Sequence, residues 1–145
     1  FGNSAGLICH AMDRAELITL NPATHEAEQA ALNLAMYHQI TVKPVKSWDY
    51  WNEDATTWDF IFVDGDHNAI ARDLPWFSRL NVGGLILFHD YSPRDATIPC
   101  YPVYDALNAM AAALGRPLDV VAADTDKVGM AGLIRNEGET WPMQR

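Results

Sequence analysis

The chain has 145 residues, 49% of them hydrophobic, which is enough for one domain with a core of its own. Ten Lys and Arg residues stand against 19 Asp and Glu residues, so the formal net charge is −9. A charge of this sign repels nucleic-acid phosphates and anionic lipid surfaces, which argues against both as partners.

The two cysteines and the apolar runs indicate the compartment. Cys9 and Cys100 have no CxxC spacing, so the sequence indicates neither a disulfide framework nor a structural zinc site. No apolar run approaches the roughly 18 residues of a membrane span. We therefore expect a cytoplasmic protein with no membrane partner.

Predicted strands and helices alternate along most of the chain. Helices are expected where apolar or Ala residues recur with a helical period, and strands where short apolar runs lie between breakers. A short helix is expected from residue 4, capped by Asn3 or Ser4, and residues 47–57 are expected to form a polar connector. The remaining helices are expected over residues 24–38, 69–80 and 103–114, and the strands over residues 17–20, 40–45, 60–63, 85–88, 118–122 and 128–134. Gly83-Gly84 is expected to turn the chain. This order predicts an α/β fold whose sheet is mostly parallel, with an antiparallel last strand.

Polar clusters follow three of the predicted strands. They are Asn21, the run Asp64-Gly65-Asp66-His67, and His89-Asp90. In an open α/β sheet, ligands bind beyond the carboxyl ends of the strands, so these residues are expected to line one pocket. The alternative is structural: an Asp that caps the next helix, and a local His–Asp hydrogen bond.

The sequence resembles a known family over about 30 residues. The segments that carry the likeness are Phe60–His67, Asp73, Trp76 and Gly83–Tyr91. They resemble the class I S-adenosylmethionine-dependent methyltransferases grouped with cephalosporin hydroxylase-like and macrocin-type O-methyltransferases. Gly2-Asn3-Ser4 is similar to the end of that family's glycine-rich cofactor loop. The resemblance implies a Rossmann-like three-layer sandwich.

The resemblance also implies a set of cofactor contacts. Glycine and the helix start would approach the methionine part of the cofactor, and the residues after the third strand would border the adenine ring. Asn21 stands where the family usually has an acidic residue for the ribose hydroxyls, so it departs from the pattern and brings no charge. The implied cofactor contacts are Gly2, Asn3, Ser4, Asn21, Ser47, Trp48 and Asp64.

A divalent ion is used by some relatives, and the matching ligand positions here are Asp64, His89 and Asp90. The resemblance thus leaves Mg²⁺ or Mn²⁺ open, and the histidine shifts the preference away from Mg²⁺ toward Mn²⁺, Fe²⁺ or no metal at all. His67 or His89 could instead act as a general base on the acceptor hydroxyl. The expected catalytic residues are therefore Asp64, His67 and His89.

The family's first strand, which should precede Gly2, is lacking in the sequence, so we expect a single methyltransferase-like domain over residues 1–145 that is N-terminally incomplete. The predicted function is O-methylation of a small molecule or sugar hydroxyl. A non-catalytic binding or assembly module with the same fold is the alternative, and homo-oligomerisation is left open. An NAD-dependent oxidoreductase is disfavoured, because no GxGxxG follows a strand.

Overall fold

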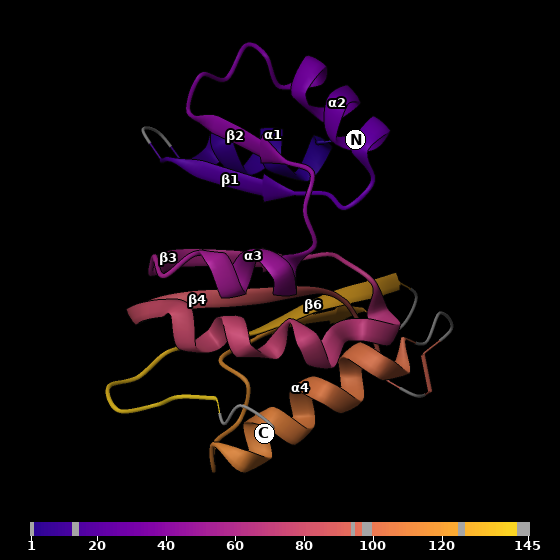
Figure 1. The fold of residues 1–145 in the computed structure, drawn as a ribbon. Helices are drawn as coiled ribbons and strands as arrows, with labels where there is room; N and C mark the ends of the chain where they lie inside the picture. The colour runs from indigo at the N-terminus through magenta and orange to yellow at the C-terminus, as the bar shows by residue number, and fades with distance from the viewer. Residues whose placement is uncertain (1, 13–14, 94, 97–99, 125–126, 142–145) are drawn as a thin grey trace. The chain divides into compact units, whose positions relative to one another are not determined.

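Strands and helices alternate along the chain in a computed structural model that describes residues 2–12, 15–93, 95–96, 100–124 and 127–141 (Figure 1). The chain divides into two compact units, Phe1–Asp54 and Ala55–Arg145. The expectation of a single domain over the whole chain stays a prediction. In the described part of the chain, no helix combines the length and apolar character needed to cross a membrane.

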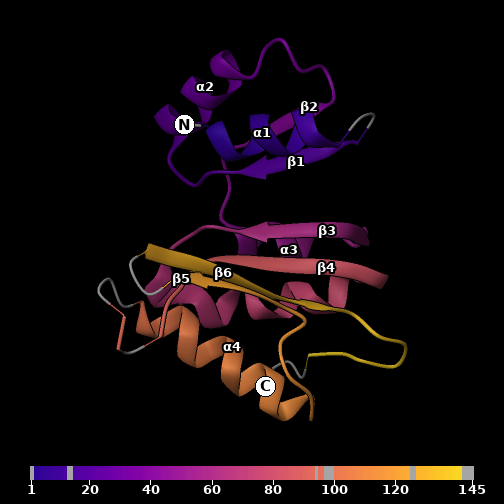
Figure 2. The ribbon, with the colours of Figure 1, turned by 180° about the vertical axis from the view of Figure 1, so that it is seen from behind.

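The first unit contains a parallel pair of strands with helices packed on it. Its elements are α1 (Asn3–Ala11), β1 (Leu17–Leu20), α2 (Thr24–Asn33), β2 (Ile40–Lys43) and α3 (Ser47–Glu53). Leu17 lies opposite Ile40 in the pair, α1 packs on β1 and α2 packs on β2. Both strands therefore end at the same edge, and the start of α1 lies at that edge too (Figures 1 and 2).

Two boundaries in this unit differ from the sequence prediction. Helix α2 ends at Asn33 rather than near His38, because the chain turns at Leu34, whose carbonyl accepts from the Tyr37 amide at 2.8 Å. The expected connector instead contains α3, whose Tyr50 is buried and supplies the packing that stabilises a short helix.

The cap of α1 also differs from the prediction. Gly2, and not Asn3 or Ser4, precedes the helix with a φ of 83°, and no side chain caps it. Glycine adopts this left-handed conformation without steric cost. A Cβ at Gly2 would also lie only 3.0 Å from Cδ1 of Leu34, so the close packing on α2 favours glycine here.

The second unit is a four-stranded sheet with helices on one face. Its elements are β3 (Trp58–Val63), the 3₁₀ helices η1 (His67–Arg72) and η2 (Leu74–Arg79), β4 (Leu80–Tyr91), α4 (Tyr101–Ala113), β5 (Val120–Asp124) and β6 (Lys127–Ile134). The strand order is β3-β4-β6-β5. Strands β3 and β4 are parallel, and β6 runs antiparallel to both of its neighbours. The predicted α/β class, mostly parallel with an antiparallel last strand, is confirmed.

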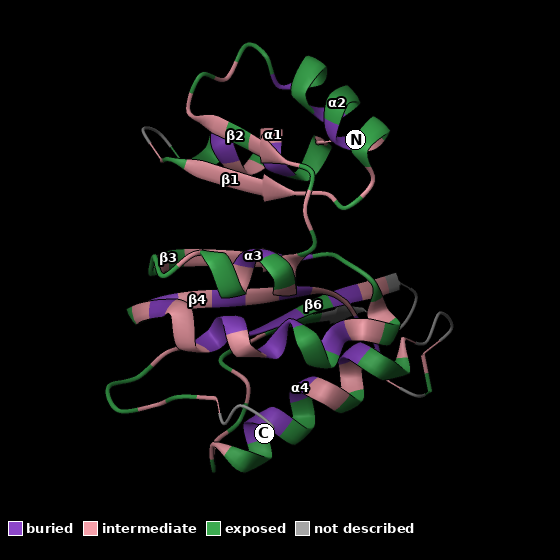
Figure 3. Ribbon diagram, in the orientation of Figure 1, coloured by how far each residue is buried: buried purple, intermediate pink, exposed green. Residues whose placement is uncertain are grey.

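The core of this unit lies between the sheet and α4, which packs on β4 and β6. Along the second half of β4, buried and half-buried residues alternate (Figure 3). Ile86 and Phe88 are fully buried and face the covered side, where they meet a fully buried set from the helices and β6. That set is Phe77, Val103, Leu107, Met110, Ala131 and Leu133. Burial of this face fixes the register of β4 and hence the position of its end.

The predicted helix over residues 69–80 was wrong in type. Two 3₁₀ helices occupy this stretch, because Pro75 has no amide hydrogen and cannot continue an α-helix from η1. The predicted turn at Gly83-Gly84 lies instead inside β4. Gly83 has a φ of 85°, and its amide donates to the carbonyl of Arg135 at 2.8 Å, so the strand passes through the irregularity without ending.

Candidate active site

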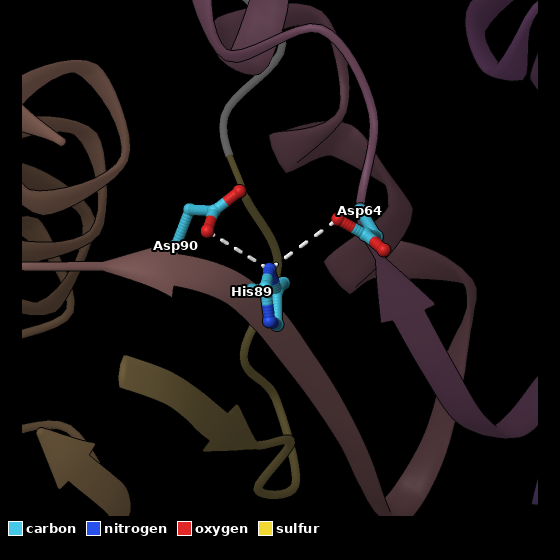
Figure 4. Close-up of side chains that lie close together, drawn as sticks. All are labelled: Asp64, His89 and Asp90. Carbon is cyan, nitrogen blue, oxygen red and sulfur yellow. Dashed lines mark ion pairs between the residues drawn. The ribbon is translucent and has the colours of Figure 1, made fainter. Parts of the chain in front are cut away.

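Three polar side chains meet at the carboxyl ends of two neighbouring parallel strands. Val63, the last residue of β3, lies opposite Phe88 of β4, so the next residues, Asp64 and His89, emerge side by side. One ligand atom each from Asp64, His89 and Asp90 lies within 4.8 Å of the others (Figure 4). The structure therefore brings together the three residues predicted as metal ligands.

The imidazole of His89 lies between the two carboxylates. Its Nδ1 is 3.0 Å from Oδ1 of Asp90 and 3.4 Å from Oδ1 of Asp64. Neither contact has hydrogen-bond geometry, and among the described residues this buried nitrogen has no hydrogen-bond partner. Two carboxylates close to one nitrogen repel each other unless a positive charge is shared among them. The arrangement suits a cation held by two oxygens and one nitrogen.

The backbone of Asp90 is strained. Its φ is 59°, the one positive value found among the non-glycine residues that the structure describes. A left-handed conformation costs such a residue about 1 kcal/mol. The pairing with β6 is irregular at the same point, between His89 and Tyr91. Strain of this kind persists where the surrounding structure imposes it, and it is concentrated at functional sites.

His67 reaches the same cluster from the loop after β3. Its Nε2 is 2.6 Å from Oδ2 of Asp90, and its side chain is 37% exposed. His67 begins η1, and the preceding Asp66 caps that helix by accepting from the Asn68 amide at 3.0 Å. The cap expected in the structural interpretation is thus present, at Asp66. The expected catalytic residues Asp64, His67 and His89 all lie around the carboxylate of Asp90.

Three of the predicted cofactor contacts follow the carboxyl ends of the two strands of the first unit. Asn21 follows β1, and its Oδ1 accepts from the Ala23 amide at 3.1 Å, which forms an Asx turn. Ser47 opens α3 after β2, and Trp48 follows it. The ammonium of Lys46 lies 5.4 Å from the ring centroid of Trp48, a cation–π contact that orients this partly exposed ring.

The other predicted cofactor contacts, Gly2, Asn3 and Ser4, form the start of α1. Asn3 and Ser4 are exposed, and Gly2 is half-buried. The first amides of a helix have no partner within the helix and favour an anion or an acceptor. The structure thus places these residues where a ligand can approach the helix start.

Two further residues, Cys100 and Tyr91, lie beside the site and were not among the predicted site residues. Cys100 precedes α4, where burial raises the pKa of its thiol and the charge of Asp90 raises it further, so it is a poor nucleophile. Tyr91 is buried against Tyr104, with ring centroids 5.0 Å apart, and its hydroxyl accepts from Nδ2 of Asn108 at 3.1 Å. In the sequence, only the Pro- and Tyr-rich composition of residues 91–104 drew attention to the segment that contains them.

Comparison with known proteins gives a family and a set of similar folds. A family model described as a methyltransferase domain matches residues 1–91. The O-methyltransferase TomG from Streptomyces achromogenes, involved in tomaymycin synthesis and solved in complex with SAM, has 18% identity and a TM-score of 0.71, over 94% of this chain and 70% of that one. An O-methyltransferase from Bacillus cereus, solved in complex with SAH, has 17% identity and a TM-score of 0.64, over 85% of this chain and 64% of that one. These identities show a shared fold, and no curated protein matches.

Proposed function

The chain belongs to methyltransferase family 24, whose model matches residues 1–91, and on this premise we propose that it transfers the methyl group of S-adenosylmethionine to a hydroxyl oxygen of a small molecule or sugar. The chain spans 64% of the Bacillus cereus enzyme's length, so the activity is proposed for the protein of which these residues form part. The complexes of the similar structures with SAM and SAH support this cofactor.

The observation that carries the proposal is the meeting of Asp64, His89 and Asp90 at the ends of β3 and β4. Exposed or half-buried carboxylates at this edge of a sheet lie where α/β proteins bind their ligands. A purely structural role explains the cap at Asp66. It explains neither the strained backbone of Asp90 nor a buried His89 nitrogen that has no hydrogen-bond partner in the described part of the chain.

The proposed site includes a divalent cation held by these three residues. Two carboxylate oxygens and one imidazole nitrogen fit Mn²⁺ better than Mg²⁺, which favours oxygen alone. Such an ion, when bound, lowers the pKa of an acceptor hydroxyl and orients its oxygen. Asp64 and Asp90 supply the negative charge that would hold it, and His89 sets the selectivity.

His67 is proposed as the general base. Because its Nε2 faces Oδ2 of Asp90 at 2.6 Å, the ring is expected to donate a hydrogen bond there and to keep the lone pair on Nδ1. Nδ1 would take the proton from the acceptor hydroxyl as the oxygen–methyl bond forms and the sulfur–methyl bond breaks. Asp90 would stabilise the imidazolium that results.

The cofactor contacts are proposed for the first unit. The free amides of Asn3 and Ser4 suit the carboxylate of the methionine part, since a helix start favours an anion. Asn21, held by its Asx turn, can present its amide group to a ribose hydroxyl, and the Trp48 ring offers a face for adenine. We also propose a small-molecule acceptor and a cytoplasmic location. The location is supported by Cys9 and Cys100, which are free cysteines and form no disulfide.

Transfer of a labelled methyl group tests the proposal. The protein is freed of metal with EDTA and incubated with labelled S-adenosylmethionine and a panel of catechols, phenols and sugars, with Mn²⁺, Mg²⁺ or no metal. Asp64→Ala is expected to lower the transfer rate by about 100-fold, because it removes a proposed ligand. Asp59→Ala, on the same strand but exposed and remote from its end, serves as the matched control. Equal rates for Asp64→Ala and the wild type would contradict the assigned site.

A further inference from the structure

Asp73 carries a deeply buried carboxylate beside the candidate site. It is 3% exposed, and it is the one ionisable acidic or basic residue among the buried residues that the structure describes. Burying a carboxylate is costly unless its oxygens are well paired. A carboxylate kept there is expected to be well paired and so to hold the groups around it in place.

The position of Asp73 would suit a helix cap, yet it does not act as one. It lies between η1 and η2 and precedes η2, where Asp often caps with its side chain. The side chain makes no cap bond to η2, and the backbone joins the two helices, with the Asp73 amide donating to the carbonyl of Ile70 at 2.9 Å and the Trp76 amide donating to the carbonyl of Asp73 at 3.1 Å. The carboxylate is directed elsewhere.

The carboxylate of Asp73 lies close to Gly65. A Cβ built on Gly65 would lie 3.8 Å from Oδ2 of Asp73, and no other atom outside the neighbouring residues comes within 4 Å of it. Gly65 stands between Asp64 and Asp66, in the turn that leads from β3 to His67. The Asp73 carboxylate therefore lies directly behind the turn that carries two of the proposed site residues.

We propose that Asp73 is a positioning residue that fixes the turn Asp64–His67 and thereby sets Asp64 and His67 at their distances from His89 and Asp90. The turn begins at the end of β3 and leads into η1, and Asp73, the residue after η1, places its Oδ2 beside the middle of the turn at Gly65. The proposal rests on the proposed function in one respect: the catalytic and metal-binding roles of Asp64 and His67, which the turn carries. Asp73 itself touches no ligand in this account.

Amide hydrogen exchange and Mn²⁺ titration test this role. Asp73→Asn keeps the size of the side chain and loses its charge, and Asp73→Ala removes the group altogether; the exposed Asp59→Asn is the matched control. In Asp73→Ala, exchange in residues 64–67 is expected to rise about tenfold, while exchange in β4 stays as in the wild type. Mn²⁺ affinity is followed by the electron paramagnetic resonance signal of the free ion. It is expected to fall 10- to 100-fold in Asp73→Ala, and by less in Asp73→Asn.

The outcomes separate positioning from general stability. If exchange rises equally in the turn and in β4, or if it stays unchanged in the turn, the proposal is overturned. If Asp73→Ala does not fold, Asp73→Asn decides by the same comparison. A wild-type protein that binds neither Mn²⁺ nor S-adenosylhomocysteine would refute the proposed function, and the exchange comparison would still decide the role of Asp73.

Discussion

Replacing Glu139 by Gln is expected to destabilise the second unit at neutral pH and to have less effect in acid. The carboxylate of Glu139 accepts two hydrogen bonds from Arg116, at 2.6 Å from Nε and 2.8 Å from Nη2, and a third from the Asn136 amide at 2.9 Å. Arg116 also pairs with Asp119. The network joins the segment after β6 to the connection between α4 and β5.

The size of the effect follows from the pKa of Glu139. The hydrogen bonds from Arg116 are the main cause that lowers this pKa from 4.5 to about 2. One pKa unit corresponds to about 1.4 kcal/mol, so the shift sets a ceiling of about 3 kcal/mol. Both side chains are 17% exposed, and solvent screens part of the interaction, so we expect Glu139→Gln to lower the free energy of unfolding by about 1–2 kcal/mol at pH 7.

The pH dependence gives the sharper test. Because the pKa is lower in the folded state, the stabilisation is complete above pH 4.5 and is lost as the pH falls from 4.5 to about 2. Urea unfolding at pH 7, 5, 4 and 3 should show a difference between wild type and Glu139→Gln that shrinks below pH 4.5. The exposed Glu137→Gln is the control. A difference that is absent at pH 7, or constant down to pH 3, would refute the reasoning.

Other substitutions test the packing and the strained site residue by thermal or urea unfolding. Gly132→Ala should prevent normal folding or lower the free energy of unfolding by about 3 kcal/mol or more, because its Cβ would lie 2.2 Å from the carbonyl oxygen of Ile86. A stability near that of the wild type would contradict this close approach of β6 to β4. Asp90→Gly should be about 1 kcal/mol more stable than Asp90→Ala, since both lose the carboxylate and only glycine relieves the positive φ; equal stability would argue against strain. Phe88→Ala, at a fully buried position, should cost about 3–5 kcal/mol, and a loss below 1 kcal/mol would contradict the assigned core.

The meeting of Asp64 with His89 and Asp90 could be predicted from the sequence because it depends on few facts. Two apolar runs without polar positions indicate parallel strands covered by other elements, and parallel neighbours end at the same edge. The residues that follow the two runs must then lie close together. The contact between His67 and Asp90 could not be predicted in this way, since it also depends on the helix η1 beginning at His67.

Features that depend on tertiary packing could not be predicted. The segment that forms α3 is rich in aromatic residues and lacks an apolar period long enough to indicate a helix, and the burial of Tyr50 becomes visible only in the fold. The burial of Asp73 and the close approach of Gly132 to Ile86 depend on residues distant in the chain. No local pattern distinguishes such residues from exposed ones.

Calorimetric titration of the purified chain with S-adenosylhomocysteine, with and without Mn²⁺, tests the central claim most directly. We expect binding in the micromolar range, and an effect of Mn²⁺ that disappears in Asp64→Ala while the control Asp59→Ala keeps it. Absence of binding by a chain shown to be folded would contradict the methyltransferase function proposed for it and would favour a non-catalytic binding or assembly module with the same fold.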